Sequence, residues 1–132
     1  MTYGCDTSFL MRILTNEPKP LSVEVISRAY MMIKAGDRFE ISDLVLSEAY
    51  FALQASYGVA KADALRVLKA ISCAQGFIVS PHAKEILAQP GLEKSSPGFV
   101  DRLIHGGYYA NGHKTAACEK SFRKLSQTEI FG

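Results

Sequence analysis

The chain has 132 residues, of which 48% are hydrophobic and 21% are charged, and its net charge is +2. This length and composition are typical of one globular domain with its own hydrophobic core. No run approaches the roughly 18–20 apolar residues that a membrane span needs, and the sequence does not open with a secretion signal. The three cysteines are widely separated, which argues against a disulfide framework or a zinc site. We therefore expect a cytoplasmic protein with no membrane contact.

Hydrophobic periodicity and turn residues predict short strands that alternate with helices. In chain order, the predicted elements are a strand over 2–5, helices over 6–14 and 21–34, a strand over 39–41, helices over 42–57 and 61–74, a strand over 77–79, helices over 82–89 and 99–110, a strand over 115–118 and a helix over 119–125. This alternation is typical of an α/β, three-layer sandwich, in which helices flank a small, mainly parallel sheet. We expect four or five strands.

Two acidic residues lie where such a fold places functional groups, since the crevice of a parallel sheet lies at the C-terminal ends of its strands, and a third lies at a helix start. Asp6 follows the first predicted strand, Glu119 follows the last, and Asp101 lies in the first turn of its helix. Each could instead be a capping acid, because a carboxylate there accepts from free helix amides and suits the positive end of the helix dipole. Position alone leaves both roles open.

Glu48 differs because it lies well inside a predicted helix. Its neighbours one turn away are Leu44, Val45, Phe51 and Ala52, so it is expected on the apolar, buried face. Burying a lone carboxylate costs several kcal/mol unless a partner compensates it. That partner could be a structural Arg or Lys, but a metal ion explains the position better.

Four clustered carboxylates would require a cation, because they cannot all ionise at close range without one. Oxygen ligands without histidine or cysteine favour Mg²⁺ or Mn²⁺ over zinc. Setting these four acids aside leaves 15 basic and nine acidic residues, a net charge of +6 that favours a polyanionic partner.

Four segments resemble the motifs of the PIN-domain family, in the same order and over essentially the whole chain. They are residues 3–12 (YGCDTSFLMR), 41–48 (ISDLVLSE), 98–104 (GFVDRLI) and 118–122 (CEKSF). The chain length is similar to that of the VapC-type toxin members. The resemblance implies a single PIN-like nuclease domain over 1–132 that hydrolyses RNA with Mg²⁺ or Mn²⁺. It also implies a small antitoxin partner and a homodimer.

The resemblance carries metal-site roles onto Asp6, Glu48, Asp101 and Glu119, and a supporting hydroxyl role onto Ser8. Glu119 stands where the family usually has Asp, and Ser121 stands where a second acid is frequent. An alternative is therefore a catalytically weak or inactive PIN-fold module that binds RNA or protein. Receiver domains and aspartyl phosphatases fit less well, since the first strand is followed by a single acid.

Several cationic side chains could contact an RNA backbone, and three of them lie together in the helix after Glu119. The candidates are Arg12, Arg102, Lys120, Arg123 and Lys124. A solvated helix face explains each of them about equally well. Tyr108 and Tyr109 could stack on bases, although core or dimer-interface packing is the more frequent role.

Overall fold

The computed structural model describes all 132 residues and shows an α/β protein with six α-helices and five short strands. The chain divides into two compact units, Met1–Ser80 and Pro81–Gly132, which are described separately. Every strand pair is parallel, which confirms the predicted fold class. The five strands form a three-stranded sheet in the first unit and a two-stranded sheet in the second. None of the helices is both long and apolar enough to cross a membrane.

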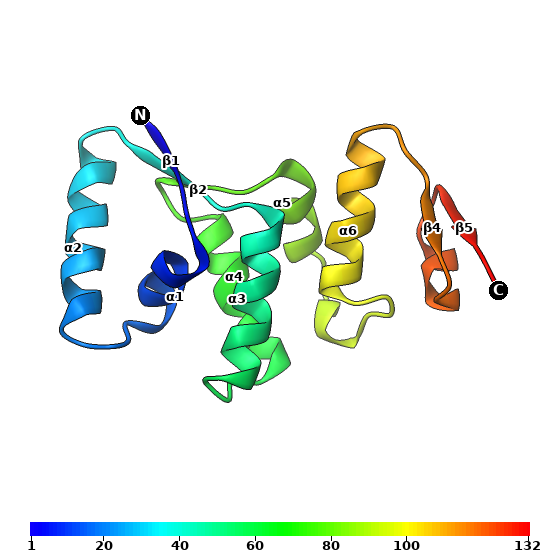
Figure 1. Cartoon of the computed structure of the whole chain (residues 1–132), viewed down its shortest axis with the longest axis horizontal. Helices are drawn as coiled ribbons and strands as arrows, with labels where there is room; N and C mark the ends of the chain where they lie inside the picture. The colour runs from blue at the N-terminus through cyan, green and yellow to red at the C-terminus, as the bar shows by residue number, and fades with distance from the viewer. The chain divides into compact units, whose positions relative to one another are not determined.

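The first unit contains a parallel sheet of order β1-β2-β3 with four helices around it (Figure 1). Its elements are β1 (Thr2–Gly4), α1 (Thr7–Thr15), α2 (Leu21–Lys34), β2 (Arg38–Glu40), α3 (Asp43–Ala55), α4 (Lys61–Ser72) and β3 (Phe77–Ile78). Helix α1 packs against α2 and α3, and α3 packs against α4. These bounds agree closely with the helices predicted from the sequence.

Phe39, at the centre of β2, organises the core of this unit. Its register partners are Tyr3 on β1 and Phe77 on β3, and each of their rings stacks on the Phe39 ring with centroids 5.8 Å apart. Phe9 of α1 stacks on it at 5.1 Å. Aromatic pairs of this kind contribute about 0.5–1.5 kcal/mol each beyond their area burial. The rings therefore hold α1 against the sheet, which fixes the position of the residues between β1 and α1.

Gly76 is the one glycine in the first unit where both conformation and space exclude a side chain. Its φ is +91°, and a Cβ built there would lie 2.5 Å from Cγ1 of Ile33 on α2. Its carbonyl accepts from the backbone N–H of Phe39 at 2.8 Å. A glycine is needed because L-residues rarely adopt this φ and because α2 approaches the backbone closely.

The second unit pairs two helices with a small sheet. Its elements are α5 (Pro81–Leu87), the short 3-10 helix η1 (Leu92–Lys94), α6 (Phe99–Ala110), β4 (Thr115–Ala117), the 3-10 helix η2 (Lys120–Lys124) and β5 (Thr128–Ile130). Helices α5 and α6 pack together, and β4 lies parallel to β5. His105 of α6 is buried and its Nδ1 lies 2.8 Å from the Thr115 hydroxyl of β4, which joins helix to sheet.

Three local features of the second unit differ from the sequence-based expectation. The helix predicted over 119–125 is the 3-10 helix η2, and the polar loop predicted over 93–98 begins inside the 3-10 turn η1. Strand β5 occupies residues for which no element was assigned. Three-residue elements depend on their pairing partners, so their local sequence gives little periodicity to detect.

Candidate metal centre

Polar side chains gather at the C-terminal edge of the three-stranded sheet. Because the strands are parallel, β1, β2 and β3 all end at this edge. The chain continues from β1 to Asp6, from β2 to the Ser42 cap of α3, and from β3 to Ser80. The edge therefore carries carboxylates and hydroxyls, which are ligands for hard cations.

Asp6 is the N-cap of α1, and its carboxylate is exposed. Its Oδ1 accepts from the Phe9 backbone N–H at 2.8 Å and from the Ser8 hydroxyl at 3.0 Å. The Phe9 amide first, then Ser8 and the charge of Arg12, hold the pKa of Asp6 below its ordinary value. Both bonds end on Oδ1, so Oδ2 of an ionised carboxylate is available to a ligand. The capping role is confirmed, and it leaves one oxygen for another role.

Glu48 lies in the middle of α3, as predicted, but the expectation that it is buried is wrong. Its side chain is exposed, as are Leu44 (70%) and Phe51 (56%) on the same side of the helix. The buried side of α3 carries Leu46, Ala49, Tyr50 and Leu53 instead. Helix α3 is apolar over most of its surface, so the sequence could not indicate which face packs inward. No burial cost therefore requires a partner for Glu48.

The Thr7 hydroxyl donates to Oε1 of Glu48 at 3.2 Å. Thr7 directly follows Asp6, so this bond brings the side chain of Glu48 to the start of α1, where Asp6 lies. Glu48, which is 41 positions from Thr7 in the sequence, is thereby held by the residue that follows the Asp6 cap. The supporting hydroxyl predicted from the sequence was Ser8, which bonds Asp6, whereas the bond of Thr7 to Glu48 was not predicted.

A second carboxylate–hydroxyl pair fixes the same edge of the sheet. The Ser80 hydroxyl, just after β3, donates to Oδ1 of Asp43 at 2.8 Å. Asp43 is in the first turn of α3, where the helix dipole favours an acid. The Ser42 hydroxyl caps the same helix by accepting from the Val45 N–H at 3.2 Å. These contacts position the start of the helix that carries Glu48.

The other two predicted site residues belong to the second unit. Asp101 is half-buried in the first turn of α6, and Glu119 is exposed at the N-cap position of η2. Neither side chain makes a capping hydrogen bond, and no hydrogen bond or ion pair joins them. Three or more potential metal ligands do not cluster within either unit.

The candidate RNA-binding cations also divide between the units. Arg12 lies in the last turn of α1, close enough for its charge to act on Asp6. Lys120, Arg123 and Lys124 are exposed on η2, while Arg102 is half-buried on α6. The Nε–H of Arg102 donates to the Pro97 carbonyl at 2.7 Å.

One solved structure similar to this chain is the crystal structure of VapBC2 from Rickettsia felis bound to a DNA fragment from their promoter. The two chains align with a TM-score of 0.44 and 18% sequence identity, over 100% of each chain. No protein-family model matches the sequence, and no curated protein matches it. The resemblance to the PIN-domain family therefore depends on the four sequence motifs.

Proposed function

We propose that this protein is a ribonuclease that uses Mg²⁺ or Mn²⁺ to hydrolyse RNA phosphodiester bonds. The observation that supports it is the hydrogen bond from the Thr7 hydroxyl to Glu48, which holds this glutamate at the start of α1, directly after the Asp6 cap that follows β1. Helix capping explains Asp6 alone. It does not explain why Thr7, the residue after Asp6, donates a hydrogen bond to the exposed side chain of Glu48.

The residues present fit a hard divalent cation. Mg²⁺ keeps several of its waters and is commonly bound by one or two carboxylates together with substrate phosphate oxygens. Asp6 offers a free Oδ2, and Glu48 offers Oε2 because its recorded hydrogen bond ends on Oε1. Both side chains are exposed, so a hydrated ion and a phosphodiester can reach them. No sulfur or imidazole group is needed.

Each residue has a separate task in this proposal. Ser8 and the Phe9 amide keep Asp6 ionised, and Thr7 orients Glu48. A bound divalent ion lowers the pKa of a coordinated water and neutralises charge on the phosphate oxygens. In-line attack of a water molecule on the phosphorus would displace the 3′-oxygen of the preceding nucleotide and leave a 5′-phosphate and a 3′-hydroxyl. Arg12, beside Asp6, is placed to attract the RNA backbone.

The sequence resemblance extends this proposal to Asp101 and Glu119 as further metal-site residues. It also extends it to a toxin role, with a small antitoxin partner and a homodimeric state. Asp101→Asn and Glu119→Gln variants test the first extension, since a metal ligand lost at either position lowers cleavage without changing the fold. Copurification with the product of an adjacent small reading frame tests the second.

The direct test is a cleavage assay on structured and unstructured RNA with Mg²⁺, with Mn²⁺ and with EDTA. We expect metal-dependent cleavage that falls about a hundredfold or more in Asp6→Asn and Glu48→Gln. Glu24→Gln, which alters another exposed helical glutamate of the first unit, serves as the matched control. Full activity in folded Asp6→Asn would overturn the proposal. RNA binding without any cleavage would instead favour a noncatalytic RNA-binding module.

A further inference from the structure

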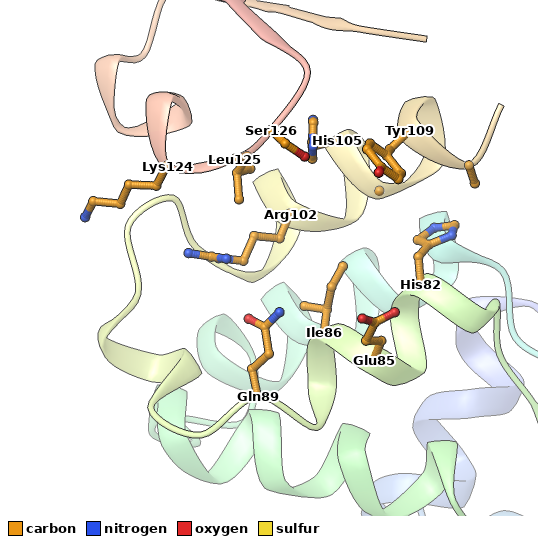
Figure 2. A pocket seen from close by; sticks show the side chains of 12 residues that line it. His82, Glu85, Ile86, Gln89, Arg102, His105, Tyr109, Lys124, Leu125 and Ser126 are labelled. Carbon is orange, nitrogen blue, oxygen red and sulfur yellow. The ribbon is translucent and has the colours of Figure 1, made fainter. Parts of the chain in front are cut away.

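A pocket of about 410 Å³ lies wholly within the second unit, between α5, α6 and the segment that follows η2 (Figure 2). This volume is within the roughly 300–1,000 Å³ of pockets that bind small molecules. The pocket takes side chains from three elements that are separated in sequence. Its lining combines apolar surface with several charged and polar side chains, and neither Asp6 nor Glu48 contributes to it.

Two cations line this pocket without an anionic partner. Arg102 and Lys124 form no ion pair in the structure. The Nε–H of Arg102 donates to the Pro97 carbonyl at 2.7 Å, which fixes the plane of the guanidinium and leaves its terminal nitrogens for another acceptor. A guanidinium fixed in this way is suited to a phosphate, which it can bind through two parallel hydrogen bonds.

The facing wall of the pocket offers hydrogen-bond acceptors. Glu85 lies on α5 and Gln89 lies two residues beyond its C-terminal end, and Figure 2 shows both side chains directed toward α6. Glu85 forms no ion pair, so its carboxylate can accept two hydrogen bonds. The ring of Tyr109 is 54% exposed at the pocket wall, where it can contact a planar group.

We propose that this pocket binds one guanine nucleotide of a single-stranded RNA. The phosphate lies at Arg102 and Lys124, and the base places its adjacent N1–H and N2–H donors on Glu85. Unstacked bases in single strands are read in this way, by hydrogen bonds to their edges and by contact with aromatic rings. An acidic peptide would satisfy the two cations, but it would bring a further negative charge to Glu85. That the nucleotide belongs to RNA rests on the proposed function.

The test is a titration of the full chain with 5′-GMP, 5′-UMP and inorganic phosphate in the presence of EDTA. Binding is measured by NMR chemical-shift changes and by calorimetry. We expect GMP to bind more tightly than UMP or phosphate. Arg102→Gln and Lys124→Gln should each weaken GMP binding about tenfold, the effect of losing one charged hydrogen bond. Glu85→Gln should remove the preference for GMP over UMP. Lys114→Gln is the matched control, since Lys114 is exposed in the same unit and lies outside the pocket.

Equal affinity for GMP, UMP and inorganic phosphate would overturn the proposal. So would a loss of GMP affinity in Lys114→Gln as large as that in Arg102→Gln and Lys124→Gln. The same titration with a short oligouridylate that carries one guanosine shows whether the nucleotide is bound as part of a strand. Because EDTA removes the metal, binding is measured separately from cleavage. If GMP binds but RNA is not cleaved, the ribonuclease proposal fails while the pocket assignment stands. If cleavage depends on Asp6 while the pocket variants leave GMP binding unchanged, the pocket assignment fails and the ribonuclease proposal stands.

Discussion

Asp6 is both a helix cap and a proposed metal ligand, and two substitutions separate these roles. Asp6→Ala removes the acceptor for the Phe9 amide and for the Ser8 hydroxyl. Losing an N-cap of this kind costs about 1 kcal/mol, within a range of roughly 0.5–2 kcal/mol. Asp6→Asn keeps an acceptor oxygen and is about as good a cap, so it should change the free energy of unfolding by only a few tenths of a kcal/mol.

The stabilisation by Asp6 should also depend on pH. Its hydrogen bonds lower its pKa in the folded protein, so the unfolded chain binds the proton more readily. The stabilisation is therefore complete above the unfolded pKa of about 3.9 and is lost as the pH falls through the lower, folded pKa. Urea denaturation at neutral and acidic pH measures both effects, and Ser42→Ala provides the matched loss of a second cap. An Asp6→Ala variant as stable as the wild type at neutral pH would refute the reasoning.

Three further predictions concern the fold. In urea denaturation, Gly76→Ala should destabilise the protein by about 1–3 kcal/mol more than Gly36→Ala. Both glycines have a positive φ, but only at Gly76 would a Cβ meet a neighbouring side chain. Equal losses of stability in the two variants would contradict this contact. Burial, and then the charge of Asp6, raise the pKa of the Cys5 thiol to about 11, so iodoacetamide at pH 8 should label the exposed Cys73 well before Cys5; equal labelling rates by mass spectrometry would exclude this. Burial lowers the pKa of His105, although a hydrogen bond with the backbone of Ser126 opposes the shift. The free energy of unfolding should therefore fall as the pH drops below about 6.5. His105→Gln should reduce that fall.

Much of the fold could be predicted from the sequence because the longer helices carry clear signals. Helices Leu21–Lys34 and Phe99–Ala110 match their predicted bounds. The starts of α1 and α3 were marked by Asp6 and Ser42, whose side chains do cap them. The strands were harder to delimit because each has two or three residues. Such short strands are defined by their pairing, which a local pattern does not contain.

The candidate site was predicted less completely. Its residues came from matching motifs, and the hydrogen bond between Thr7 and Glu48 depends on how α1 packs against α3. Contrary to the expectation from the sequence, Glu48 does not need a compensating partner on account of burial, because its side of α3 is exposed. Thr7 was missed because a threonine in the first turn of a helix gives no sign of a bond to another helix. The roles of Asp101 and Glu119 stay predictions from the sequence.

The central claim is that Asp6 and Glu48 bind one divalent cation, and Mn²⁺ binding followed by electron paramagnetic resonance tests it most directly. The wild type, Asp6→Asn, Glu48→Gln and the double variant form a double-mutant cycle, and Glu24→Gln is the control outside it. We expect each single variant at the site to weaken Mn²⁺ binding about tenfold or more, with the double variant losing less than the product of the two, because both carboxylates act on the same ion. Unchanged Mn²⁺ affinity in both single variants, or a loss equal to that of the Glu24→Gln control, would contradict the claim.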